Sequence, residues 1–216
     1  MRLWVRFLDL LYPEKCVLCG TLLGKGEQDL CRRCRVEAPG YHDGKRKLQF
    51  LDSFAAVWYY EGYVRESILR FKFSGRRGYA KSYGRLLSMK LIQEHPQGFD
   101  VVTWVPVSTL RRLGRGYDQS ELLAQAVSAE LELPARKLLR KIRHNARQSG
   151  IVGTAQRRAN VLGVYRVNAP ESIRGKRILL VDDVLTTGAT AGECARMLLM
   201  AGAKEVHCAA LAAPRK

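Results

Sequence analysis

The sequence predicts an α/β protein with a mostly parallel sheet, preceded by a small cysteine-rich unit. Apolar runs of strand length alternate with stretches of helical periodicity from residue 54 onward, and four cysteines cluster near the N-terminus. Strands that alternate with helices form a parallel sheet with helices on its faces. With 216 residues, the chain can form one such core with an appendage. Because 47 % of the residues are hydrophobic, we expect a folded rather than a disordered chain.

Each element is predicted from its own pattern. Strands are short apolar, β-rich runs, and helices carry apolar residues on one face, as Leu122, Leu123, Ala126 and Val127 do. Glycines and arginines mark RRLGRGYD, residues 111–118, as a loop. In chain order we expect a strand at 54–60, helices at 62–73 and about 79–93, a strand at 101–107, a helix at 119–131, strands at 163–167 and 177–181, a helix at 190–201 and a strand at 205–210.

The most informative segment is RILLVDDVLTTGATAGE, residues 177–193. Its apolar run is typical of a buried parallel strand, and Asp182 and Asp183 stand at the carboxyl end, where open α/β sheets bind ligands. A turn of small residues follows, which can offer backbone N–H groups and hydroxyls to a phosphate at a helix N-terminus. This turn consists of Thr186, Thr187, Gly188, Ala189 and Thr190.

Carboxylates accept hydrogen bonds from sugar hydroxyls, so the segment predicts a site for a ribose 5-phosphate group. The spacing of Thr190 and Glu193 also predicts a capping box at the helix start. The alternative is an acidic turn before a threonine-rich helix cap. No Walker P-loop and no complete G-x-G-x-x-G occurs, which argues against the common nucleotide-binding folds.

VDDVLTTGAT resembles the motif of type I phosphoribosyltransferases that binds 5-phosphoribosyl-1-pyrophosphate (PRPP). The resemblance implies that Asp182 and Asp183 contact the ribose 2′- and 3′-hydroxyls, that residues 186–190 bind the 5′-phosphate, and that magnesium accompanies PRPP. Some members of that family have a loop aspartate that acts on the departing base. Thr186 stands there in this chain, so the sequence assigns no catalytic residue.

Two basic stretches resemble the ComF family of competence proteins. RGYDQSELLA, residues 115–124, is similar to its RGFNQ-type signature, and residues 147–165 are similar to a stretch that closes as a hood over PRPP. The resemblance implies contacts to pyrophosphate, hood or DNA from Lys72, Arg111, Arg112, Arg115, Gln119, Gln148 and Arg157. Without the resemblance, residues 115–118 are a turn with a helix cap at Asp118, and 147–165 are a surface loop.

The cysteine-rich unit has the spacing of a metal site. Two C-x₂-C pairs are separated by a stretch that a single tetrahedral site can span, and Gly20 suits a knuckle turn with positive φ. We therefore expect structural zinc, with iron–sulfur, disulfides or free thiols as alternatives. ComF proteins commonly begin with such a zinc ribbon. The expected ligands are Cys16, Cys19, Cys31 and Cys34.

The N-terminal segment MRLWVRFLDLLYP carries an apolar stripe at helical spacing, too short and too charged to span a bilayer. We expect this stripe to pack on the protein body, with peripheral attachment at the inner membrane face as the alternative, and we expect a cytoplasmic protein. The predicted units are 1–47, with an N-terminal helix, the Cys₄ ribbon and a linker, and 48–216, a phosphoribosyltransferase-like domain.

The formal net charge of +17 points to a polyanionic partner or an acidic small molecule, although a solvated basic surface remains the alternative. The ComF resemblance implies a PRPP-binding protein of natural competence that handles incoming single-stranded DNA alongside DNA-uptake proteins. A phosphoribosyltransferase of nucleotide salvage or biosynthesis is the second hypothesis. A non-catalytic PRPP sensor is the third.

Overall fold

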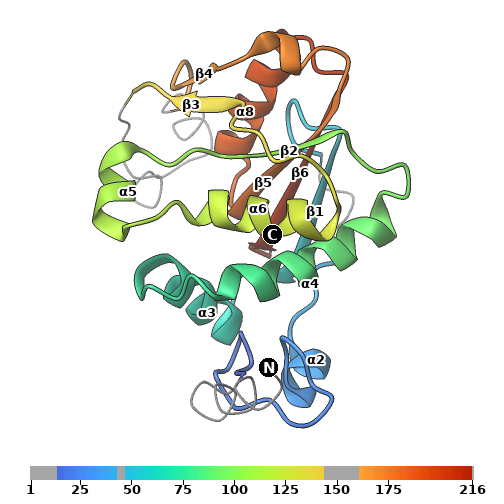
Figure 1. Cartoon of the computed structure of the whole chain (residues 1–216), viewed down its shortest axis with the longest axis vertical. Coiled ribbons are helices and arrows are strands. Elements are labelled where there is room, and N and C mark those ends of the chain that lie inside the picture. The colour runs from blue at the N-terminus through green and yellow to red at the C-terminus, as the bar shows by residue number, and fades with distance from the viewer. Residues whose placement is uncertain (1–13, 43–46, 144–160, 216) are drawn as a thin grey trace, which may run out of the picture.

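The computed structural model describes residues 14–42, 47–143 and 161–215. Within them, a four-stranded parallel sheet has the order β1-β6-β5-β2 (Figure 1). The strands are β1 (Ser53–Tyr59), β2 (Val101–Trp104), β5 (Arg177–Val184) and β6 (Glu205–Ala213). The predicted α/β class is confirmed, and β5 and β6 each extend further toward the carboxyl end than the sequence pattern indicates.

Helices cover both faces of this sheet. On one face pack α4 (Tyr79–Glu94) and α6 (Gln119–Glu130), with α3 (Gly62–Phe73) beside them, and on the other packs α8 (Ala189–Met200). Side chains of β5 alternate between the two cores: Leu179 and Val181 face α4 and α6, and Ile178 and Leu180 face α8. Burial on both faces explains the uninterrupted apolar run.

A helix, α5 (Thr109–Arg115), replaces most of the loop expected at residues 111–118. Gly114 suggested a loop, but the helix accommodates it and ends only at Gly116, whose φ is +73°. Arg77 of the α3–α4 connection donates to the Gly116 carbonyl at 2.9 Å. Tertiary contacts at the end of this short helix thus outweigh the local glycine signal.

A two-stranded antiparallel ribbon also forms, from β3 (Leu139–Lys141) and β4 (Tyr165–Val167). The strand expected at 163–167 corresponds to β4, whereas β3 has no counterpart among the predicted elements. Three residues are too few to show an alternation, so β3 is defined by its partner alone. A 3₁₀ turn (Pro170–Ser172) then leads into β5.

The cysteine-rich unit packs against α3 and α4, where Figure 1 shows it beneath these helices with α2 (Arg32–Glu37). Val17, Leu18 and Leu30 belong to the same buried cluster as Ile68 and Tyr83 of the helices. Arg85 of α4 also binds Asp29 through two hydrogen bonds, of 2.9 and 2.5 Å. The ribbon is therefore an extension of one hydrophobic core rather than a tethered appendage.

Two predicted features lie outside the described residues: the apolar helix at 1–13 and most of the hood stretch. Among the residues that are described, no helix combines the length and apolar character needed to cross a membrane.

Candidate functional site

A cavity of about 210 Å³ opens at the carboxyl ends of β5 and β2. The pairing of Trp104 with Val181 brings the loop after β2 and the two aspartates to one edge of the sheet. Most of the described residues that the sequence predicted for the site line this cavity. Its lining includes Lys72, Arg115, Gln119, Asp182, Asp183, Thr186, Gly188, Ala189 and Thr190. Thr187 instead lines a neighbouring, more apolar cavity of about 310 Å³.

The small-residue turn at residues 186–190 owes its shape to Gly188, the N-cap of α8, whose φ is +80°. Leu48 packs so closely that a Cβ at this position would lie 2.7 Å from its Cδ2. The backbone conformation therefore favours glycine, and a larger residue would also force the Leu48 side chain to shift. The first turn of α8 has backbone N–H groups without helical acceptors beside the cavity, as anion sites at helix N-termini require.

The predicted capping box is wrong. The helix begins at Ala189 after Gly188, so Thr190 is already inside it. Glu193 instead accepts a hydrogen bond from the backbone N–H of Gly163 at 3.0 Å and pairs with Arg196 at 2.8 Å. The carboxylate that local spacing assigned to the cap thus serves as a long-range acceptor for the backbone of the 161–164 segment.

The two aspartates differ in their surroundings. Asp183 is only 5 % exposed, and its two oxygens bind Lys72 Nζ and Gln119 Nε2, each at 2.7 Å. Asp182 is half-buried, and its Oδ1 accepts hydrogen bonds from Ser120 Oγ at 3.1 Å and from the N–H of Asp183 at 2.8 Å. Burial, and then the charge of Asp183, raise the pKa of Asp182 to about 7, against the opposing effect of Lys72.

The α5–α6 junction links the aspartate pair to Arg115 at the end of α5. Gln119 bridges Asp183 and Arg115, whose Nη1 donates to Gln119 Oε1 at 2.7 Å. The Arg115 guanidinium also stacks over the Phe73 ring, 4.6 Å from its centroid. Asp118 caps α6 as expected and also accepts from the N–H of Val107 at 3.3 Å, which ties the loop after β2 to the helix start.

Of the other predicted contacts, only Arg112 has a described side chain, and it does not line the cavity. Arg112 lies exposed on α5. The side chain of Arg111, and both Gln148 and Arg157, lie outside the part of the chain that the structure describes.

Lys141 and Tyr165 line the cavity without having been chosen from the sequence as contacts. They face one another in the β3–β4 ribbon, where Lys141 Nζ lies 5.7 Å from the Tyr165 ring centroid. Tyr165 is the last residue of the stretch 147–165 that resembles the hood. Lys141 lies in a basic region without a pattern, so only the pairing of β3 with β4 identifies it.

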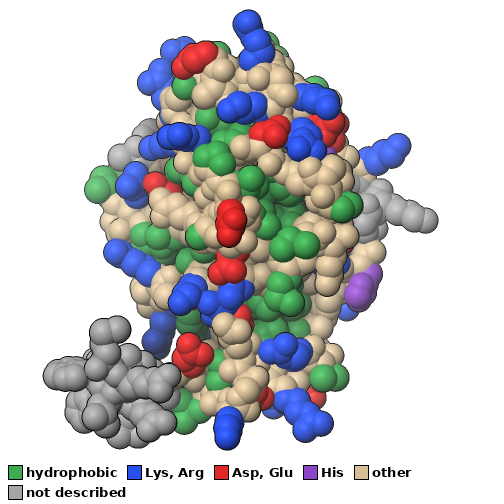
Figure 2. Space-filling view, turned by 45° about the vertical axis from the view of Figure 1, so that its right-hand side comes forward, with side chains coloured by type: hydrophobic (Ala, Val, Ile, Leu, Met, Phe, Trp, Pro, Cys, Tyr) green, Lys and Arg blue, Asp and Glu red, His purple; other side chains and the backbone are tan. Residues whose placement is uncertain are grey.

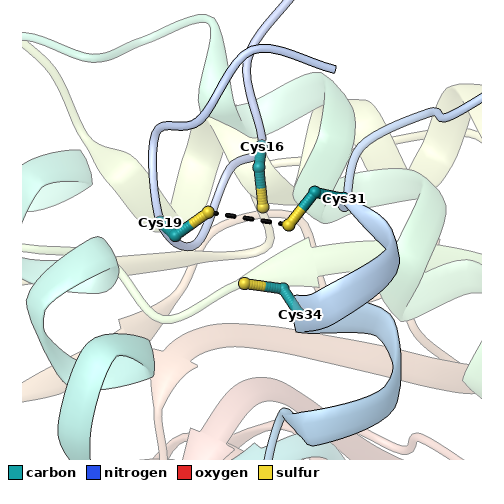
Figure 3. Close-up of side chains that lie close together, drawn as sticks. All are labelled: Cys16, Cys19, Cys31 and Cys34. Atoms are coloured by element: carbon teal, nitrogen blue, oxygen red, sulfur yellow. Dashed lines mark hydrogen bonds between the residues drawn. The ribbon is translucent and has the colours of Figure 1, made fainter. Parts of the chain in front are cut away.

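The four predicted metal ligands converge (Figure 3). Their sulfur atoms lie within 4.8 Å of one another, and Cys19 Sγ is 3.7 Å from Cys31 Sγ. Tetrahedral zinc at about 2.3 Å from each sulfur requires sulfurs about 3.8 Å apart. A disulfide would require about 2.05 Å, and all four are free thiols. The residues thus fit zinc, and Gly20 has the expected positive φ, +79°.

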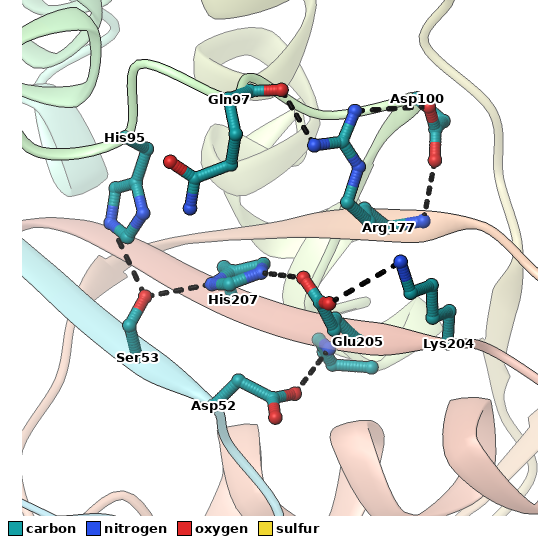
Figure 4. Close-up of polar contacts among 10 residues, drawn as sticks. Asp52, Ser53, His95, Gln97, Asp100, Arg177, Lys204, Glu205 and His207 are labelled. Atoms are coloured by element: carbon teal, nitrogen blue, oxygen red, sulfur yellow. Dashed lines mark hydrogen bonds and ion pairs between the residues drawn. The ribbon is translucent and has the colours of Figure 1, made fainter.

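A second polar cluster lies at the amino end of the sheet, away from the cavity (Figure 4). Ser53 Oγ lies 2.8 Å from His207 Nδ1 and 3.2 Å from His95 Nε2, and His207 Nε2 lies 3.2 Å from Glu205. These contacts tie the end of α4 to β1 and β6. The sequence left these histidines unassigned.

The basic charge is dispersed on the face shown in Figure 2. Lys and Arg side chains are scattered among acidic and apolar ones rather than gathered in one stripe. Charge alone therefore does not locate a binding surface on this face.

Two family models agree with this architecture. Residues 118–216 match the model of the phosphoribosyl transferase domain, and residues 7–43 match the double zinc ribbon domain. A solved glutamine PRPP amidotransferase from B. subtilis aligns with 66 % of this chain and 30 % of its own, with 25 % identity and a TM-score of 0.46.

Three curated relatives match over most of their length. Competence protein F of Haemophilus influenzae is 27 % identical over 89 % of this chain and 81 % of its own. Competence protein ComFC of Bacillus subtilis is 28 % identical over 87 % and 72 %. DNA utilization protein YhgH of Escherichia coli K12 is 32 % identical over 92 % and 96 %. With its zinc ribbon, its phosphoribosyltransferase domain and these relatives, the chain belongs to the ComF family of competence-related proteins.

Proposed function

We propose that the cavity binds PRPP and that the protein serves DNA uptake by handling incoming single-stranded DNA. One observation carries the first part: a carboxylate pair and a glycine-capped helix N-terminus face the same cavity of about 210 Å³. Carboxylates suit ribose hydroxyls, and the helix N-terminus suits the 5′-phosphate.

In this proposal Asp182 and Asp183 bind the ribose hydroxyls, and residues 186–190 bind the 5′-phosphate. Lys72, Arg115 and Lys141 supply positive charge toward the pyrophosphate. Magnesium would accompany PRPP, since it prefers oxygen ligands and the phosphates of a substrate. We assign no catalytic residue, because a threonine, Thr186, stands where an acid would act on the departing base.

Calorimetric titration with PRPP and magnesium tests the site. Asp182→Asn and Asp183→Asn should each weaken binding at least tenfold, because each removes a charged acceptor from a sugar hydroxyl. The control is Glu171→Gln, an exposed carboxylate outside the cavity. Unchanged affinity in both aspartate variants would overturn the assignment.

The DNA-handling part rests on the names of the relatives and on the net charge of +17. Several aromatic residues offer little free surface for stacking on bases: Phe71 is buried, and Tyr59, Tyr60 and Tyr63 are half-buried. Phe73 is 63 % exposed beside Arg115, a pairing that suits stacking on a base near a backbone phosphate. We therefore place single-stranded DNA across this rim of the site.

Anisotropy titrations with a fluorescent single-stranded oligonucleotide test this surface. Phe73→Ala should weaken binding about tenfold, and Phe50→Ala, a second exposed phenylalanine that lines the neighbouring cavity instead, should not. For contact with about five phosphates, log affinity should fall against log salt with a slope near −3.5. An affinity that does not change with salt would contradict DNA binding.

A panel of bases incubated with PRPP separates the two remaining hypotheses. Release of pyrophosphate with a nucleotide product would support a salvage or biosynthetic enzyme, and binding without turnover would support a sensor. We further propose a cytoplasmic location, with peripheral attachment at the inner membrane face as the alternative, and a boundary between the two units at 47/48. Leu48 begins the segment that packs against the small-residue turn at residues 186–190.

A further inference from the structure

Helix α3 lies next to the cysteine-rich unit (Figure 1), and Lys72 near its end lines the cavity. Val64, Ile68 and Phe71 are fully buried in the core shared by the ribbon, α4 and α6. The polar side chains of its second half reach in two directions, to the ribbon and to the cavity. The proposed function gives no reason for this arrangement.

The contacts to the ribbon use the backbone of the first cysteine knuckle. Ser67 Oγ donates to the carbonyl of Val17, and Arg70 Nη2 donates to that of Leu18. Val17 and Leu18 are the two residues between Cys16 and Cys19. These carbonyls can face α3 only while the knuckle keeps its folded turn, which zinc stabilises. Both cysteines are among the four residues whose sulfurs fit the metal.

The contact to the cavity comes from Lys72, two residues beyond Arg70 on α3. Lys72 Nζ binds Asp183 Oδ1 at 2.7 Å, with only 16 % of the lysine side chain exposed. The end of the helix is also fixed, because Tyr117 OH donates to the carbonyl of Phe71. Ser67 and Lys72 are separated by about 7.5 Å along the helix axis. A shift of α3 at the ribbon would therefore displace Lys72 at the site.

We propose that α3 couples the zinc knuckle to the ribose-phosphate site, with Ser67 and Arg70 as positioning residues that hold Lys72 on Asp183. The proposal rests on the proposed PRPP site. When the knuckle opens, Ser67 and Arg70 lose their acceptors, and α3 no longer holds the ammonium in place. The two neighbouring carboxylates, Asp182 and Asp183, then lack their counter-charge, so one takes up a proton and accepts a ribose hydroxyl less well.

Substitutions in α3 test the coupling in the full-length, zinc-loaded protein. Arg70→Leu should weaken PRPP binding about tenfold with unchanged zinc content, and Arg70→Lys should partly restore it. Ser67→Ala should act in the same direction. The matched control is Arg65→Leu, an exposed arginine on the same helix. In a Lys72→Met background, Arg70→Leu should cause no further loss, because the lysine has then already been removed.

A second readout needs no ligand. Carboxyl NMR should find the pKa of Asp182 higher in Arg70→Leu and Lys72→Met than in wild type, because Lys72 lowers it. A purely structural role of Arg70 would leave this titration unchanged. Wild-type titration and PRPP affinity in Arg70→Leu would overturn the coupling. Absence of PRPP binding in wild type would instead contradict the proposed function, and the NMR comparison would still test the coupling.

Discussion

Asp182 lies where its ionised form is disfavoured, beside a second aspartate at the buried end of β5. The folded protein holds this proton up to about pH 7, whereas the unfolded chain releases it near its ordinary pKa of 3.8. The folded state thus binds more protons between these values, so this residue lowers stability as the pH rises from about 4 to 7. Placing a second carboxylate beside Asp183 therefore reduces the stability of the fold above pH 7.

Asp182→Asn should increase stability at pH 8 by about 1–2 kcal/mol, because the neutral amide removes the buried charge. Near pH 4 the difference from wild type should vanish. Urea unfolding at both pH values measures this, with Glu171→Gln as the exposed control. A destabilised variant at pH 8 would show that Asp182 contributes favourable contacts that outweigh its burial.

His95 behaves in the opposite sense. Burial, and then the nearby His207, lower its pKa, while Glu94 acts against this. His95 also lies against Phe99 and shares Ser53 with His207. The unfolded chain binds more protons than the folded one as the pH falls below about 6.5, so this contribution to stability is lost in acid. His95→Gln should therefore unfold with a weaker dependence on pH between 5 and 7, as thermal melts across that range would measure.

At the scale of the elements, the α4–α6 contact depends on one glycine. A Cβ on Gly84 would lie 2.5 Å from the Cβ of Ala126 and 2.9 Å from its backbone carbon. Gly84→Ala should therefore separate the helices and destabilise the protein by about 1–3 kcal/mol. Gly78→Ala is the control, because its Cβ meets nothing within 4 Å. Equal unfolding midpoints in denaturant for the two variants would contradict this tight contact.

The segment around residues 177–193 was largely predictable from sequence, whereas α5 was not. The strand, the aspartates and the start of α8 near residue 190 were predictable, because strand, turn and helix signals lie in one continuous segment. The cap was not, since Glu193 finds a partner at Gly163. Nor was α5, whose end is stabilised by Arg77 from another part of the chain. Local patterns predict an element but not the competing tertiary contact.

At the scale of the whole molecule, the ribbon shares its core with α3 and α4. Loss of zinc should therefore destabilise the whole domain and not the ribbon alone. Cys34→Ser should abolish zinc binding, from about one ion per chain, and lower the melting temperature. Cys208→Ala, in the core beside α8, should keep its zinc. Metal analysis with thermal melts separates the two. A Cys34→Ser variant that retains a full equivalent of zinc would refute the Cys₄ site.

By itself the sequence determined the fold class and the four cysteines of the metal site, because each is written in a short segment whose residues act together. Only the tertiary structure decided which distant groups complete the site: Lys72 and Gln119 on Asp183, and Lys141 from β3. It also decided that the ribbon packs on α3 through Ser67 and Arg70. Such contacts depend on how buried surfaces meet in three dimensions, and no local pattern specifies that.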